Sequence, residues 1–280
     1  MAGVQHCKSV WACPMCSAQI LVGRAVRLQG VVDGWHAEGK RVGFLTLTLR
    51  HTAKMSITDV WDKLMKAWAK TQGSSWSSLV KGTKTQAGIG VHFAGGRVAV
   101  PICRTVEVSR GDHGWHPHLH LLIFVRDEDA WNRVVSFLVP RWVDCVRAVG
   151  ARVDADKCID AELVDPSTDS AERVASYLAK SVFDGSGSHS AIHWEMAGGL
   201  GKAGRRGSRT PFQILADAEA GDVRSAALWH EFEVGSRGRR QMSIPPILLD
   251  RYGFRDATDA EEFDAADERA QDWLPGNRPL

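Results

Sequence analysis

Hydrophobic and polar residues alternate along three stretches of the chain, as in strands that bury one face. Residues 42–49 place leucines on one face and threonines on the other. Residues 101–110 and 115–125 show the same alternation, and the Gly-Asp-His-Gly tetrapeptide at 111–114 between them is typical of a tight turn. The pattern therefore predicts a β-hairpin at the centre of the chain and another strand before it.

Helical periodicity dominates much of the remaining sequence. Residues 58–71 carry apolar side chains at helical spacing, and residues 127–149 do the same with an interruption expected near Pro140. Shorter patterns predict helices at 20–28, 169–181, 211–220 and 222–234, and a strand at 157–164. Helices interleaved with an antiparallel hairpin indicate an α+β fold, in which helices flank a central antiparallel sheet.

The composition is that of a soluble globular protein. Of 280 residues, 44% are hydrophobic and 24% are charged, which excludes a disordered chain. The apolar runs are too short to span a bilayer, and cysteines stand where a signal peptide would need apolar residues. We therefore expect a cytoplasmic location and no membrane partner. The formal net charge of +2 does not by itself indicate a nucleic-acid binder.

Composition divides the chain into three expected parts. Residues 1–40 form a cysteine-rich N-terminal segment, and residues 41–185 hold the hairpin and most of the predicted elements. Residues 186–280 form a basic and helical C-terminal region, within which residues 250–273 are expected to be a solvated acidic tail.

Two histidines on the second hairpin strand are the most specific chemical feature. His118 and His120 are two residues apart, so in a strand they point to the same side, opposite an aliphatic face. Counting back from the turn at 111–114 places Glu107 opposite His118 on that side. These residues offer two nitrogens and one carboxylate to a divalent ion such as Mg²⁺ or Mn²⁺. The alternative is that Glu107 is an ordinary surface residue.

The candidate catalytic nucleophile is a tyrosine on the predicted helix at 169–181. Tyr177 shares a helix face with Arg173 and Lys180, whose charges favour the phenolate and balance charge on an attacked phosphate. The alternative is a tyrosine at a helix edge with solvated neighbours. The second tyrosine, Tyr252, also lies near arginines but has no such ligand set upstream.

Three cysteines near the N-terminus are spaced like metal ligands. Cys7, Cys13 and Cys16 form a Cys-x5-Cys-x2-Cys pattern, and a Cys-Pro-x-Cys turn suits a tetrahedral Zn²⁺ site. His6 is the candidate fourth ligand. A reduced, metal-free loop is the alternative interpretation.

Aromatic and basic residues offer two candidate contacts to DNA. Most of the 11 tryptophans fall at core spacing, whereas Trp115 lies beside the predicted metal site, where its ring would stack on a base. A basic cluster consists of Lys202, Arg205, Arg206 and Arg209. This cluster fits phosphate contacts and an ordinary solvated loop equally well.

Taken together, these motifs resemble those of the HUH endonucleases. The matching segments are Phe44-Leu-Thr-Leu-Thr-Leu-Arg-His51, Glu107 with Gly114-Trp-His-Pro-His-Leu-His120, and Tyr177-Leu-Ala-Lys180. Within that superfamily, the chain is most similar to actinobacterial rolling-circle plasmid replication initiators, or Rep proteins. The segments that carry this second resemblance are Cys7-Lys-Ser-Val-Trp-Ala-Cys-Pro-Met-Cys16, Arg209-Thr-Pro-Phe-Gln-Ile-Leu, Ala227-Leu-Trp-His-Glu-Phe and Gly238-Arg-Arg.

The resemblance implies an enzyme that nicks and joins one DNA strand at a plasmid origin. In that family the tyrosine attacks the scissile phosphate, leaving a 5′-phosphotyrosine and a free 3′-hydroxyl, while an ion held by the histidines and the acid polarises the phosphate. The implied partners are origin DNA, single-stranded or in a hairpin, and a host helicase and polymerase. Related proteins carry a glutamate four residues before the tyrosine, where this chain has Arg173. We therefore expect the adduct to be resolved by a 3′-hydroxyl rather than by water.

Two alternatives to a replication initiator remain open on the sequence. A relaxase or a single-tyrosine transposase would use the same residues for the same chemistry. A non-catalytic, zinc-dependent DNA-binding regulator would instead use the histidines structurally.

Overall fold

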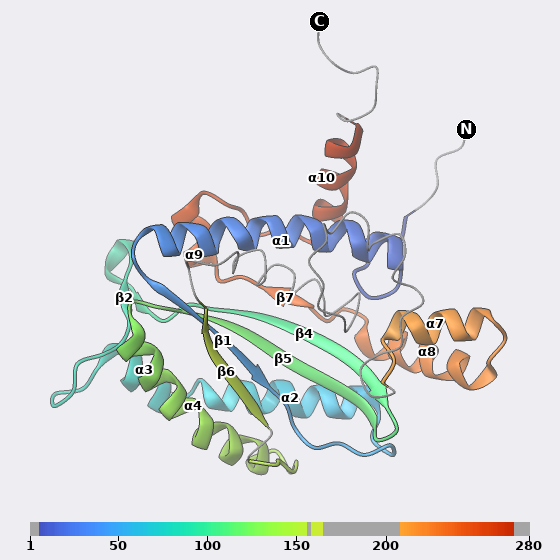
Figure 1. Ribbon diagram of the computed structural model, residues 1–280, viewed down its shortest axis with the longest axis horizontal. Helices are drawn as coiled ribbons and strands as arrows, with labels where there is room; N and C mark the ends of the chain where they lie inside the picture. The colour runs from blue at the N-terminus through green and yellow to red at the C-terminus, as the bar shows by residue number, and fades with distance from the viewer. Residues whose placement is uncertain (1–5, 156–157, 165–207, 272–280) are drawn as a thin grey trace, which may run out of the picture.

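An antiparallel sheet forms the centre of the fold in this computed structural model, which describes residues 6–155, 158–164 and 208–271 (Figure 1). The sheet confirms the predicted α+β class. Its five strands, in spatial order, are β6 (Ile159–Val164), β1 (Arg41–Leu47), β5 (Gly114–Val125), β4 (Ile102–Gly111) and β7 (Met242–Ser243). A separate ribbon consists of β2 (Val91–His92) and β3 (Val98–Ala99), joined by the short 3-10 turn η1 (Ala94–Gly96).

The predicted hairpin register is confirmed. Glu107 pairs with His118 across β4 and β5, and Gly111 pairs with Gly114 around the turn. Gly114 has a φ of +96°, and a Cβ at this position would lie 2.8 Å from the carbonyl oxygen of Thr52. Only glycine can adopt this φ and leave room for this carbonyl oxygen. Gly114 therefore fixes the hairpin register that brings Glu107 and His118 together.

Helices α2 (Ile57–Thr71) and α4 (Glu128–Ala148) pack against the aliphatic side of the hairpin, and α3 (Ser74–Lys81) lies nearby (Figure 1). The interruption expected near Pro140 is wrong, because α4 continues through it. Pro140 and the residue four positions before it, Ser136, are both exposed. Water can therefore reach the carbonyl that loses its helical partner, while buried Leu138 and Trp142 hold the helix in place.

The opposite side of the sheet is covered over part of its length. Helix α1 (Pro14–Ala37), much longer than the predicted 20–28, packs there with α9 (Pro246–Tyr252). Buried residues of α1 form a second core with Leu122 and Phe124. The strand face that carries His118 and His120 is thus closed at one end, where Phe44 of the second core lies against His120.

The C-terminal elements fold back onto the rest of the chain. Helices α7 (Pro211–Glu219) and α8 (Val223–Ser236) match the predicted pair at 211–220 and 222–234. The acidic stretch is not a solvated tail, because its helix α10 (Asp259–Gln271) packs against α1 (Figure 1). Opposite charges explain this packing: Asp259 pairs with Arg24, and Glu262 pairs with Arg27.

Some sequence predictions fall outside the described residues, including the helix at 169–181 and most of the basic loop. Among the helices that the structure describes, none has the combination of length and apolarity needed to cross a membrane.

Candidate metal centre and its surroundings

Glu107 on β4 and the two histidines on β5 form a compact group of ligand atoms. Glu107 Oε2 lies 2.7 Å from His120 Nε2 and 4.0 Å from His118 Nδ1. The ligand atoms of all three residues lie within 4.8 Å of one another. Ligands about 2.1 Å from an octahedral ion lie about 3 to 4 Å apart, so this group is close to the size that Mg²⁺ or Mn²⁺ requires.

The neighbouring strand β1 contributes to the surroundings of His120. Its residue Thr46 pairs with His120 across the sheet, and the Thr46 hydroxyl lies 3.0 Å from His120 Nδ1. The Phe44 ring stacks on the imidazole, with centroids 5.6 Å apart and planes 16° from parallel. His120 is therefore fixed on three sides, with its Nε2 directed at Glu107.

Two further histidines adjoin the group, and the sequence reasoning did not assign them to it. His116 stacks edge-on against His118 at 4.0 Å between centroids, and His51 lies 4.4 Å from the His116 ring. The sequence could have indicated His116, because alternate residues of a strand point to the same side and His116 therefore lies on the same face of β5 as His118 and His120. The approach of His51, from the loop after β1, has no local sequence signal.

The electrostatics of the group suit a cation. Burial is the main cause that lowers the pKa of His118 to about 4 and that of His116 to about 3, with smaller contributions from neighbouring imidazoles, while the Glu107 carboxylate opposes the shift at His118. Burial opposes ionisation of Glu107, but the hydrogen bond from His120 and the nearby imidazoles outweigh it and lower the Glu107 pKa. At neutral pH His118 and His116 are thus neutral and Glu107 is a carboxylate, the protonation states that metal ligands need.

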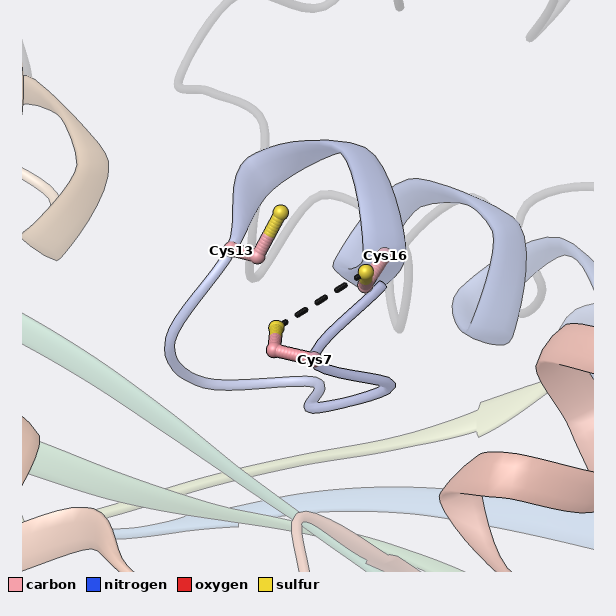
Figure 2. Close-up of side chains that lie close together, drawn as sticks. All are labelled: Cys7, Cys13 and Cys16. Carbon is pink, nitrogen blue, oxygen red and sulfur yellow. Dashed lines mark hydrogen bonds between the residues drawn. The ribbon is translucent and has the colours of Figure 1, made fainter. Parts of the chain in front are cut away.

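The three N-terminal cysteines also come together, at the start of α1 (Figure 2). Cys7 Sγ lies 3.8 Å from Cys16 Sγ, and Cys13 occupies the N-cap of the helix. Burial opposes ionisation of Cys13, yet backbone N–H donors at the helix start lower its pKa, whereas burial raises the pKa of Cys16 to about 11. Three converging thiols fit a Zn²⁺ ion, whose charge would stabilise the thiolates.

The structure does not bring His6 into this cysteine group. The His6 ring instead contacts Phe263 of α10, with centroids 4.7 Å apart. Within the described parts of the chain, no fourth histidine, cysteine or acid joins the three thiols.

Trp115 does not offer a stacking surface for DNA. Its side chain is 1% exposed and packs against Phe232 of α8, with centroids 5.7 Å apart. Side chains alternate between the two faces of a strand, so Trp115 points to the same core-facing side of β5 as Leu119. Its predicted role in base stacking is therefore corrected to a role in the core.

Arg209 has partners within the protein. Its guanidinium lies 2.6 Å from Asp217 Oδ2 and 2.9 Å from Ser225 Oγ, and its backbone pairs with that of Arg110 on β4. These contacts connect α7 and α8 to the hairpin. The other predicted DNA-binding and catalytic residues, Arg173, Tyr177, Lys180, Lys202, Arg205 and Arg206, lie outside the described residues.

Tyr252 is held in a structural contact. Its hydroxyl donates a hydrogen bond of 2.9 Å to Glu38 Oε1, and its ring lies against Gly34 of α1. Burial and the neighbouring Glu38 carboxylate raise the Tyr252 pKa well above its ordinary value. Both effects disfavour the phenolate, so Tyr252 is a poor nucleophile.

The comparisons with known proteins agree with the resemblance in the motifs. The chain is 26% identical over 313 aligned residues to Protein rep of Streptomyces lividans, with 94% of this chain and 67% of that protein covered. It is also 28% identical to the Neomycin resistance protein of Streptomyces cyanogenus, over 44% of this chain and 31% of that protein. No protein-family model and no solved structure matches the chain. The predicted resemblance to actinobacterial plasmid Rep proteins is confirmed.

Proposed function

We propose that the protein initiates rolling-circle replication of a plasmid as a site-specific, single-strand DNA endonuclease and strand transferase. Similarity to Protein rep over 94% of the chain supports a plasmid replication protein at the general level. The observation that carries the proposed chemistry is the convergence of Glu107, His118 and His120 at one end of the sheet face. A divalent ion bound there, Mg²⁺ or Mn²⁺, would supply Lewis-acid polarisation of a phosphate.

The proposed nucleophile is Tyr177, because the chain has two tyrosines and Tyr252 is engaged with Glu38. The phenolic oxygen forms a bond to phosphorus as the bond from phosphorus to the 3′ oxygen breaks. The phenol loses its proton, and the departing 3′ oxygen gains one. The products are a 5′-phosphotyrosine and a 3′-hydroxyl that primes synthesis. Arg173 and Lys180 balance the charge on the phosphate.

The remaining proposals concern partners and the N-terminal cysteines. Plasmid origin DNA is the substrate, and a host helicase and polymerase extend the new 3′ end. A Zn²⁺ ion at Cys7, Cys13 and Cys16 holds the segment before α1 in place. A regulator that bound the same DNA without cutting it would share the zinc site but would form no covalent adduct.

The test is cleavage of a labelled single strand that carries the origin, with Mn²⁺ or Mg²⁺ added. Tyr177→Phe removes the nucleophilic oxygen, so strand cleavage and the protein–DNA adduct on denaturing gels should both disappear, while origin binding persists. Tyr252→Phe is the matched control and should cleave normally. Cleavage by Tyr177→Phe that is lost in Tyr252→Phe would assign the reaction to the other tyrosine, and binding without any cleavage would favour a regulator.

A further inference from the structure

The ring nitrogen of His120 that faces away from Glu107 has a defined partner on β1. His120 Nε2 is directed at the Glu107 carboxylate, and its Nδ1 lies 3.0 Å from the hydroxyl of Thr46. A histidine that binds a metal through one nitrogen carries its proton on the other, and a hydrogen-bond partner there fixes the tautomer. Thr46 is placed to do this for His120.

His118 has a longer connection of the same kind. Its Nδ1 faces Glu107 at 4.0 Å, while its Nε2 lies 3.0 Å from Nδ1 of His116. The Nε2 of His116 lies in turn 2.7 Å from the hydroxyl of Thr48, which is also on the β1 side of the group. Thr48, His116 and His118 thus form a continuous chain of polar contacts that ends at the candidate metal centre.

Two proton orders satisfy this chain of contacts, and only one of them leaves a ligand lone pair on His118 Nδ1. In that order the Thr48 hydroxyl accepts the Nε2–H of His116. The Nδ1 of His116 is then unprotonated and accepts the Nε2–H of His118. This order leaves the lone pair of His118 Nδ1 directed toward Glu107.

We propose that Thr48 and His116 are positioning residues that fix the tautomer of His118 and present its Nδ1 to a divalent ion shared with Glu107 and His120. The alternating threonines of the Phe44–His51 motif thereby gain a chemical role. Thr46 fixes the tautomer of His120, and Thr48 fixes that of His118 through His116. This inference rests on the proposed function, because it assumes that the group binds a metal.

The first measurement needs no metal. Long-range ¹H–¹⁵N NMR of the metal-free protein identifies which nitrogen of each imidazole carries the proton. In the unmutated protein His118 should be protonated on Nε2. Thr48→Val should give a mixture of His118 tautomers, Thr48→Ser should restore the single form, and Thr46→Val should leave His118 unchanged. Protonation of His118 on Nδ1 in the unmutated protein would overturn the inference.

The second measurement is the affinity of the protein for Mn²⁺, determined by titration in the absence of DNA. Thr48→Val and His116→Phe should each weaken Mn²⁺ binding by about tenfold or more, as loss of an outer partner does at other metal sites, and Thr48→Ser should bind nearly normally. Unchanged affinity in Thr48→Val would sink the inference while leaving the proposed function standing. No Mn²⁺ binding by the unmutated protein would overturn both, and the NMR result would then describe a hydrogen-bond chain without a metal.

Discussion

Glu107 shows how neighbouring side chains determine the state of a single group. The carboxyl of Glu107 is partly buried, which opposes its ionisation, yet the contact with His120 and the nearby imidazole of His118 lower its pKa. The carboxylate is also the only charged oxygen ligand in the described group. Its charge, more than its shape, should therefore decide whether a cation binds.

Replacing Glu107 with glutamine tests this argument, since the amide keeps the size and removes the charge. Glu107→Gln should weaken Mn²⁺ binding at least about tenfold and reduce strand cleavage in parallel, with the fold retained. Glu162→Gln, at an exposed position on the edge strand β6, is the matched control and should behave like the unmutated protein. Equal Mn²⁺ affinity in the two variants would remove Glu107 from the ligand set.

Strand parity explains which residues of this site could be predicted from the sequence. The period of two and the turn at 111–114 were enough to place Glu107 opposite His118. The same rule, applied one step further, puts His116 beside them and Trp115 in the core. His51 could not be found in this way, because its approach depends on the path of a loop rather than on any repeat.

At the scale of elements, the junction between α1 and α9 depends on one acid. Glu38 follows α1, and its carboxylate accepts hydrogen bonds from Arg251 and from Tyr252. The Arg251 hydrogen bond is the main cause of a Glu38 pKa lowered to about 2, against the opposing effect of burial. Because this value lies below the ordinary 4.5, the contact stabilises the fold above about pH 4.5 and is lost as the pH falls toward 2.

Glu38→Gln should therefore make the free energy of unfolding less dependent on pH in the acid range. At neutral pH the loss should be less than about 1 kcal/mol, because the pair is partly exposed. Between about pH 5 and pH 2 the variant should lose less stability than the unmutated protein, as measured by urea unfolding at each pH. Asp33→Asn, at an exposed position on α1, should leave the slope unchanged. An identical slope for Glu38→Gln would show that the carboxylate is not perturbed.

Elements that carry a hydrophobic periodicity or a cap in their own sequence could be predicted. Elements that form only by contact with segments distant in sequence could not. The hairpin, α2, α7 and α8 carry their own periodicity and caps, such as the capping box of Thr210 and Gln213. The short strand β7 exists only because it pairs with β4, and α1 extends beyond its predicted ends because the sheet and the C-terminal helices cover it. Pairing of this kind leaves no pattern in the segment itself.

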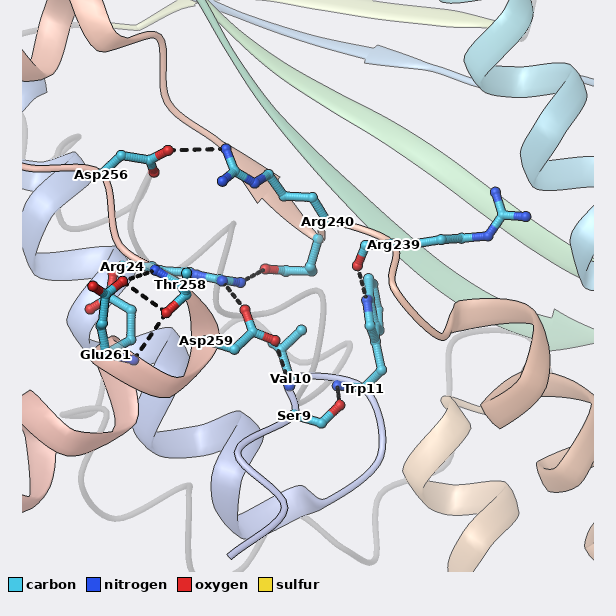
Figure 3. Close-up of polar contacts among 12 residues, drawn as sticks. Ser9, Val10, Trp11, Arg24, Arg239, Arg240, Asp256, Thr258, Asp259 and Glu261 are labelled. Atoms are coloured by element: carbon cyan, nitrogen blue, oxygen red, sulfur yellow. Dashed lines mark hydrogen bonds and ion pairs between the residues drawn. The ribbon is translucent and has the colours of Figure 1, made fainter.

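At the scale of the whole molecule, the N-terminal segment and the C-terminal elements stabilise each other (Figure 3). The indole of Trp11 donates a 2.8 Å hydrogen bond to the carbonyl oxygen of Arg239, and Asp259 accepts from the backbone N–H of Val10 at 3.1 Å. Asp259 also pairs with Arg24, whose side chain is 7% exposed. The cysteine group is therefore anchored through contacts between residues more than 200 positions apart in sequence.

The Arg24–Asp259 pair gives a test of this anchoring. Asp259→Asn removes the charge that faces a buried guanidinium, leaving the hydrogen bond from Arg24 to Gln241 at 3.2 Å. The free energy of unfolding should fall by about 1–3 kcal/mol, the usual cost of a buried charged group that loses a partner. Asp264→Asn is the matched control on the same helix. Its side chain is 55% exposed, and its contact with Lys8 should contribute less than about 1 kcal/mol.

Because Asp259 also holds Val10, between Cys7 and Cys13, the same variant should loosen the cysteine group. Reaction of the thiols with a maleimide should be faster in Asp259→Asn than in the unmutated protein when both are metal-free, and Zn²⁺ should slow it in each. Equal stability and equal thiol reactivity of Asp259→Asn and the unmutated protein would mean that α10 packs on α1 without supporting the cysteine group. A selective increase for Asp259→Asn would instead make the acidic helix a structural part of the N-terminal segment.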